Sequence, residues 1–242
     1  MLEFAGVCYL DTPKTGSTFI RDFLTRHIDG KPLRGHKHRR LGYFHDRSKF
    51  HFSSCRDPLD QYASLYRFGC EGKGAFFAHQ RMHGTKLLET YGELGGFEAW
   101  LEMILDGPID SYLSRRAAAM FLPGLGLMSN RFMLLNLRGF ANPLLRPRSD
   151  VGLRRALRTR YIPDAVVKTE TLNADLLALV EGPLLPHLRK PAQARKLLAD
   201  GARRVNTTAG ETGRSGISGA LLARLEAAEW PHYEILGYPS RQ

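Results

Sequence analysis

Residues 4–19 read FAGVCYLDTPKTGSTF, and this stretch decides the fold. The apolar run from Phe4 to Leu10 is typical of a buried strand, and Asp11-Thr12-Pro13 then favours a loop. A helix is expected to begin at Ser17 and to reach Ile28. A strand that passes through a short loop into a helix is typical of α/β proteins, whose ligands bind beyond the carboxyl ends of parallel strands. The residues that follow each strand are therefore where function is expected.

The same alternation continues along the chain. Strands are expected at residues 50–55 and 164–169, and the first of these precedes a helix over 58–68 that Asp57 would cap and Pro58 would open. Further helices are expected at residues 97–105, 109–121, 172–180, 192–199 and 219–229. Glycine-rich segments near 69–96 and 202–219 are expected to be irregular loops or lids. The pattern predicts an α/β fold with a central parallel sheet flanked by helices, in a single domain over residues 1–242.

The composition is that of a globular protein with a strong positive charge. Of the 242 residues, 43% are hydrophobic and 24% are charged, which argues against disorder. Thirty-five Lys and Arg against 24 Asp and Glu give a net charge of +11. That charge favours an anionic partner, which would be nucleic acid, an acidic membrane surface or a ligand with several phosphates or sulfates.

The N-terminal residues and the cysteines favour a cytoplasmic protein. The first apolar run has no basic region before it, so a strand is expected there rather than a signal peptide. No stretch approaches the roughly 18 apolar residues of a membrane span. Cys8, Cys55 and Cys70 have neither metal-binding nor disulfide spacing, and they are expected to be small buried residues in a reducing compartment.

The loop at residues 11–18 has the parts of an anion-binding site. Gly16 lets the backbone approach a ligand, the helix N-terminus offers N–H donors, and Lys14 adds a positive charge. The order differs from the GxxxxGK[ST] loop of nucleotide-binding proteins because the lysine precedes the glycine, which disfavours a magnesium-dependent kinase. The alternative is an ordinary helix start with a solvated Lys14.

A second polar group follows the strand at 50–55. Arg56 closes that strand, and Ser64 lies about two turns into the next helix. A guanidinium and a hydroxyl in these places would bind a second phosphate near the first loop. Taken alone, Arg56-Asp57-Pro58 is also a common way to begin a helix.

Together the two motifs resemble those of PAPS-dependent sulfotransferases, where PAPS is 3′-phosphoadenosine 5′-phosphosulfate. Residues 13–18 resemble the 5′-phosphosulfate loop of that family, and residues 55–66 resemble its 3′-phosphate motif. Weaker similarity covers 167–176, which resembles a later strand and helix of the family, and 204–208 and 233–238, which resemble the C-terminal part of carbohydrate-type members. The middle of the chain, roughly 70–160, matches nothing in the family. The resemblance implies a P-loop-like sulfotransferase fold and cofactor contacts from Pro13, Lys14, Thr15, Gly16, Ser17, Thr18, Arg56, Ser64, Asn206 and Arg214.

The resemblance also implies an activity. The enzyme would move a sulfuryl group from PAPS to a hydroxyl or amine of a carbohydrate or other small acceptor, and would release adenosine 3′,5′-bisphosphate without a metal and without a nucleic-acid partner. Lys14 would stabilise the negative charge that grows on the leaving phosphate.

The acceptor must lose a proton, and the resemblance places the general base in the segment after the first helix. His38 is the first candidate and His36 the second, because the neighbouring Lys and Arg favour a neutral ring that accepts a proton. Glu71 and Glu170 are distant alternatives. The basic segment 31–40 is either a solvated face or a recognition site for an anionic acceptor such as an acidic glycan.

Two other classes of function stay open. A small-molecule kinase would need a lysine after the loop glycine and an acidic magnesium ligand, and the sequence places neither. A non-catalytic nucleic-acid-binding protein would need aromatic and basic residues interleaved on one surface, whereas most Tyr and Phe here have the helical spacing of a core.

Overall fold

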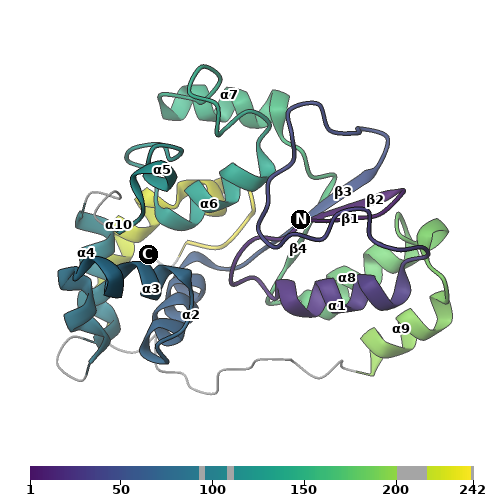
Figure 1. Cartoon of the computed structure of the whole chain (residues 1–242), viewed down its shortest axis with the longest axis horizontal. Helices are drawn as coiled ribbons and strands as arrows, with labels where there is room; N and C mark the ends of the chain where they lie inside the picture. The colour runs from purple at the N-terminus through teal and green to yellow at the C-terminus, as the bar shows by residue number, and fades with distance from the viewer. Residues whose placement is uncertain (93–95, 108–111, 201–216, 241–242) are drawn as a thin grey trace. The chain divides into compact units, whose positions relative to one another are not determined.

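The computed structural model describes residues 1–92, 96–107, 112–200 and 217–240. The chain is an α/β protein with a four-stranded, mostly parallel open sheet and many helices (Figure 1). The strands are β1 (Leu2–Glu3), β2 (Val7–Leu10), β3 (Phe50–Cys55) and β4 (Ala165–Lys168). The helices are α1 (Ser17–His27), α2 (Pro58–Cys70), α3 (Ala75–His83), α4 (Gly96–Asp106), α5 (Arg115–Ala118), α6 (Leu127–Asn136), α7 (Asp150–Arg160), α8 (Leu172–Glu181), α9 (Pro191–Ala199), α10 (Gly219–Ala228) and α11 (Trp230–Glu234), with the 3₁₀ helices η1 (Lys86–Tyr91) and η3 (Leu185–His187).

The predicted single domain contains two compact units, which are described separately. The first unit carries the whole sheet, and among the described residues it comprises 1–56, 132–140 and 147–200. The second unit is helical in its described part, which comprises 57–92, 96–107, 112–131, 141–146 and 217–240.

The sheet brings the ends of three strands together. Its order is β1-β2-β3-β4, in which β2, β3 and β4 are parallel and β1 is an antiparallel edge. The register pairs Leu10 with Ser53 and Cys55 with Lys168. The three parallel strands therefore end at one edge of the sheet, and the residues that follow them meet there.

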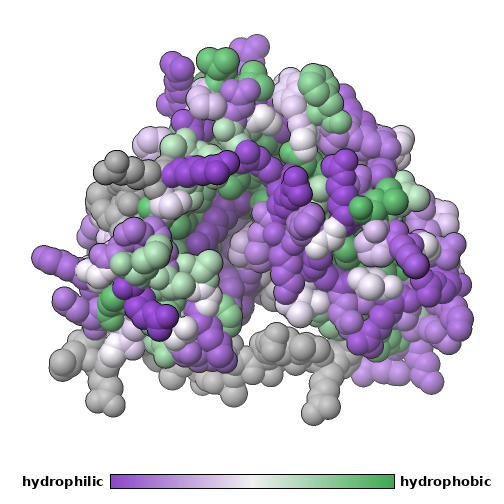
Figure 2. Space-filling model, in the orientation of Figure 1, coloured by the Kyte–Doolittle hydropathy of each residue, from purple (hydrophilic) through white to green (hydrophobic). Residues whose placement is uncertain are grey.

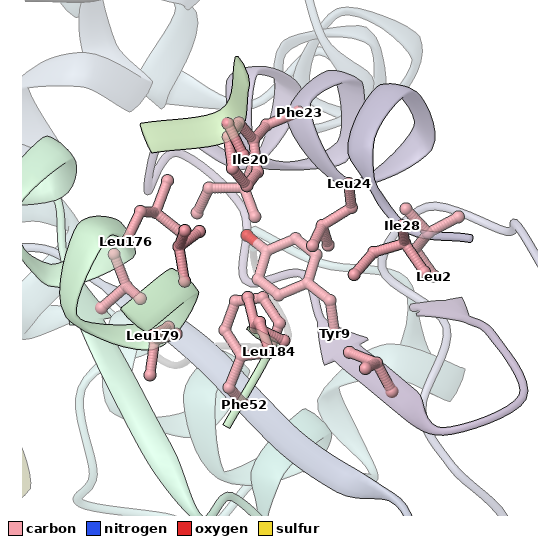
Figure 3. Packing of buried hydrophobic residues seen from close by; sticks show 14 of the residues in the cluster. Leu2, Tyr9, Ile20, Phe23, Leu24, Ile28, Phe52, Leu176, Leu179 and Leu184 are labelled. Carbon is pink, nitrogen blue, oxygen red and sulfur yellow. The ribbon is translucent and has the colours of Figure 1, made fainter. Parts of the chain in front are cut away.

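Helices cover one face of this sheet. Side chains alternate along β2, so Val7 and Tyr9 point to the face that α1, α8 and α9 cover, and Cys8 and Leu10 point to the other face. Figure 3 shows Tyr9 and Phe52 among the apolar side chains of the covering helices. The core on this face contains Leu2, Phe4, Val7, Tyr9, Ile20, Phe23, Leu24, Ile28, Phe52, Val167, Leu176, Leu179, Val180, Leu184, Ala194 and Leu198.

Local signals predict most of these elements, and α2 shows why. The side chain of Asp57 accepts a hydrogen bond from the N–H of Asp60, and Pro58 occupies the first turn. Both features act within one helical turn, so the sequence alone reveals them.

Other elements differ from the sequence prediction. The strand expected over 4–10 is shorter, because the N–H of Phe4 donates to the carbonyl of Val7 and closes a turn between β1 and β2, so that only Val7–Leu10 of that range is a strand. The segment 69–96, expected to be irregular, contains α3 and η1, and the basic helix α7 was not predicted.

Two further predictions are wrong. The helix expected over 109–121 is reduced to α5 in the described residues, because Ser114 caps a short turn there and Tyr112 turns back to bond with the carbonyl of Met103. Cys70, expected to be buried, is exposed at the end of α2.

The core of the second unit is aromatic. Trp100 is fully buried, and its ring lies within 6.3 Å, centre to centre, of five other rings. These rings belong to Tyr62, Tyr66, Phe76, Tyr91 and Phe97. Aromatic pairs at these separations pack favourably, so one tryptophan joins α2, α3, η1 and α4.

A buried carboxylate fixes the start of α6 in the same unit. Glu229 accepts hydrogen bonds from the Tyr62 hydroxyl (2.6 Å) and from the N–H groups of Met128 (3.0 Å) and Ser129 (2.6 Å). Burial raises the pKa of Glu229, and the bonds from these donors offset part of that effect. The hydroxyl of Ser129 bonds in turn with Nδ1 of His232 at 2.9 Å. The carboxylate thus satisfies N–H groups that the first turn of a helix leaves without partners.

The surface is mostly polar on the side that Figure 2 shows. Hydrophilic side chains cover most of the coloured area, and hydrophobic ones form small separate groups. Within the described residues, no helix combines the length and the apolar character that crossing a membrane requires.

Candidate anion-binding site

The loop after β2 has the backbone geometry of an anion cradle. Lys14 has φ +66° and Gly16 has φ +74°, while the φ of Thr15 between them is not positive. Alternation of this kind turns successive N–H groups toward one concave side. Gly16 precedes α1, which has neither a side-chain cap nor an acidic residue in its first turn. The loop therefore presents backbone donors and a helix N-terminus to the same ligand position.

Hydroxyl groups tie this loop to β3. The Thr15 hydroxyl donates to the carbonyl of Thr12 (2.8 Å) and lies 2.6 Å from the Ser54 hydroxyl, which is also 2.6 Å from the Tyr9 hydroxyl. Burial raises the pKa of Tyr9, so its hydroxyl stays protonated. The side chain of Thr15 is occupied in holding the loop, and Thr15 can serve a ligand only through its backbone N–H.

His38 is attached to the beginning of the loop. Its Nδ1 lies 2.7 Å from the carbonyl oxygen of Asp11, and its backbone N–H donates to Asp11 Oδ1 at 2.8 Å. A carbonyl oxygen only accepts, so Nδ1 carries the hydrogen and, in the neutral ring, Nε2 keeps the lone pair. His38 is exposed, with φ +54°. Lys14 and His38 are the two non-glycine residues of the described chain with positive φ, a conformation that gathers at functional sites.

Asp11 and Arg21 hold the segment that carries His38. The buried carboxylate of Asp11 accepts a hydrogen bond from Arg21 at 2.8 Å, and Arg21 also donates to the carbonyl of Gly35 at 2.7 Å. Glu3 pairs with Arg34 in an antiparallel bridge, so part of the basic segment 31–40 lies along the edge strand β1. All side chains of this segment are exposed. Backbone contacts therefore hold this segment in place, and His38 is fixed beside the loop although it lies at the surface.

The second histidine candidate is held differently. The carbonyl of His36 accepts a hydrogen bond from the α-amino group of Met1 at 2.6 Å. No hydrogen bond of the His36 ring is found among the described residues. The structure thus brings His38, rather than His36, into a fixed position at the loop.

The predicted 3′-phosphate residues fall in different units. Arg56 follows β3 in the first unit and is half-buried, whereas Ser64 is buried in α2 of the second unit. Of the other expected residues, Asn206 and Arg214 lie outside the described residues.

The alternative carboxylate bases are both exposed. Glu170 is exposed after β4, in the first unit. Glu71 is exposed in the second unit and forms an ion pair with Lys73 at 2.9 Å.

The corner between β4 and α8 lies next to the loop. Asp175 Oδ2 accepts hydrogen bonds from the Lys168 N–H (2.7 Å) and the Thr171 hydroxyl (2.9 Å). A Cβ placed on Gly16 would lie 3.4 Å from a methyl carbon of Leu172 at the start of α8. Residues 168–175, which carry part of the weaker resemblance, therefore have a structural role here.

Four residues of this site were not predicted from the sequence. These are Tyr9, Asp11, Arg21 and Ser54. Two features of the sequence could have identified three of them. Tyr9 and Ser54 are polar residues within otherwise apolar buried strands, and Asp11 is a carboxylate that directly follows such a strand.

Searches against protein-family models, curated proteins and solved structures found no significant match for this chain.

Proposed function

We propose that this chain is a sulfotransferase that moves a sulfuryl group from PAPS to a hydroxyl of a carbohydrate or other small acceptor, on a P-loop-like sulfotransferase fold. One observation carries the proposal. Of the three catalytic candidates Lys14, His38 and His36, the first two are the two described non-glycine residues with a left-handed backbone. Lys14 lies in the loop after β2, and His38 is bonded to the carbonyl of Asp11 at the start of that loop. Strained backbone is retained where a site requires it.

The residues of the loop fit the 5′ end of such a donor. The Lys14 ammonium and the N–H groups at the start of α1 would stabilise negative charge on a phosphate oxygen. Arg21 compensates the nearby negative charge of Asp11, so that carboxylate does not oppose a bound anion. When bound, PAPS supplies the sulfuryl group. The transfer would then depend on positioning and charge stabilisation, which these residues provide.

His38 would act as the general base. With Nδ1 donating to the Asp11 carbonyl, the Nε2 lone pair can take the proton from an acceptor hydroxyl while the oxygen of that hydroxyl forms its bond to sulfur. The imidazolium that forms keeps its hydrogen bond to the Asp11 carbonyl. The exposed basic segment 31–40 around His38 would bind an anionic acceptor.

The identity of the sulfuryl donor can be tested by comparing which nucleotides the protein binds. Adenosine 3′,5′-bisphosphate should raise the melting temperature of the protein, whereas ATP with magnesium should not. Lys14→Ala should remove that shift and abolish transfer while the far-ultraviolet circular dichroism spectrum is retained. Lys196→Ala, which removes an exposed lysine of α9, is the matched control and should behave as the wild type. A shift by ATP alone would instead favour a phosphotransferase.

Variants of the two histidines test whether His38 is the general base. We expect His38→Gln to lower kcat by roughly 10²- to 10⁴-fold, as loss of a general base does, without changing the nucleotide-induced shift. His36→Gln should leave kcat unchanged, because the ring of His36 is not held at the loop. Equal kcat in both variants would remove His38 from the mechanism.

A further inference from the structure

The first unit exposes an aromatic pair that the proposed reaction does not use. Phe44 is 96% exposed and Tyr43 is 43% exposed. Their ring centres lie 5.1 Å apart, edge to face at 82°. Single exposed hydrophobic residues are common on protein surfaces, so this exposure alone would not indicate a site.

Two arginines lie beside the aromatic pair. The guanidinium carbon of Arg138 is 5.1 Å from the centre of the Tyr43 ring. The N–H of Arg138 donates to the carbonyl of Arg160 at 3.0 Å, and the Arg160 guanidinium donates to the carbonyl of Arg138 at 3.3 Å. The backbone thus keeps two cationic side chains and one ring together.

No carboxylate within the described ranges forms an ion pair with either arginine. Burial lowers the pKa of Arg160. The nearby Tyr43 raises this pKa, and the like charge of Arg138 lowers it. Two positive groups without a counter-charge repel each other, and a bound anion would relieve that repulsion.

This group of residues lies close to the proposed general base. Leu41 and Ile162 pack against the side chains of Met1, Cys8 and Leu10, on the sheet face opposite α1. Leu41 precedes Tyr43 by two residues, and Ile162 follows Arg160 by two. Tyr43 is five residues beyond His38, so their Cα atoms are at most about 18 Å apart. A ligand only a few rings long could reach both.

The aromatic–arginine surface consists of Tyr43, Phe44, Arg138 and Arg160. We infer that this surface is an acceptor subsite for a ring that bears a carboxylate or a sulfate. The aromatic side chains would pack against the ring, and the guanidinium groups would bind the anionic group through paired N–H donors. Its place in catalysis rests on the proposed function, whereas its binding of an anionic ring does not.

Binding without nucleotide tests the surface directly. Calorimetric titrations would compare a glucuronate-containing disaccharide, the matching neutral disaccharide and 4-hydroxybenzoate. We expect Phe44→Ala to raise Kd for the charged ring about threefold to tenfold and Arg138→Gln to raise it about tenfold or more. Arg155→Gln removes the same charge from the exposed face of α7 and should leave Kd unchanged. The tighter of the two charged probes identifies a sugar acid or an aryl acid as the class.

The outcomes separate this inference from the proposed function. Equal Kd for wild type, Phe44→Ala and Arg138→Gln would overturn the subsite. Equal Kd for the charged and neutral disaccharides, together with no binding of 4-hydroxybenzoate, would also overturn it. Phe44 is almost wholly exposed, so its truncation keeps the fold and the test valid even if Arg138→Gln is destabilised.

Transfer kinetics supply the second readout. With PAPS, Phe44→Ala should raise KM for the anionic acceptor and leave kcat and the nucleotide-induced thermal shift unchanged. An unchanged KM together with a normal nucleotide shift would refute the subsite and leave the sulfotransferase proposal standing. Ring binding without any nucleotide shift would refute the sulfotransferase and leave the subsite.

Discussion

The hydroxyl cluster beneath the loop should behave as a coupled unit. Tyr9 and Ser54 are completely buried and their oxygens are 2.6 Å apart, and Ser54 is equally close to the Thr15 hydroxyl. A buried hydrogen bond contributes about 1 kcal/mol net. Ser54→Ala breaks two such bonds and should lower the free energy of unfolding by about 2 kcal/mol, and Tyr9→Phe breaks one and should lower it by about 1 kcal/mol.

The double variant loses the same two bonds in total, so its cost should be about 2 rather than about 3 kcal/mol. Urea unfolding followed by circular dichroism gives the four free energies needed for this cycle. Tyr9→Phe combined with Ser53→Ala is the control, because the Ser53 hydroxyl donates to the carbonyl of Leu10 and should add independently. If the costs of Tyr9→Phe and Ser54→Ala simply add, the loop is not held by this cluster and the reasoning is wrong.

Three further predictions concern the backbone and one buried ring. Gly16→Ala should cost roughly 1–2 kcal/mol of unfolding free energy in urea, because alanine is strained at φ +74°; a smaller cost would show that the loop relaxes. Asp57→Ala should cost about 1 kcal/mol through loss of the α2 cap, and Asp57→Asn should restore most of it, whereas no rescue would argue against capping. Burial lowers the pKa of His232 to about 3, so its contribution to stability is complete above the unfolded pKa near 6.5 and is lost as pH falls toward 3, by about 1.4 kcal/mol per pH unit. An NMR titration should find this ring neutral from pH 8 to pH 4, and a midpoint near 6.5 would contradict its burial.

Prediction from sequence succeeded where the signal was short in range. The loop between β2 and α1 and the cap of α2 each depend on residues within one or two turns. It failed at residues 109–121, where the apolar spacing suggested a long helix. There the contact of Tyr112 with the carbonyl of Met103 competes with helix formation. The spacing of apolar residues along the sequence cannot predict such a contact.

The same distinction applies to the candidate site and its surroundings. The sequence by itself determined the loop composition, the positive charge around it and the histidines that could serve it, because these are properties of single residues and close neighbours. Only the tertiary structure decided that Asp11 binds Arg21 and orients His38, and that Arg138 meets both Tyr43 and Arg160. Residues separated by 10 to 95 positions come together there because sheet pairing and core packing set the path of the chain, and no local preference specifies that path.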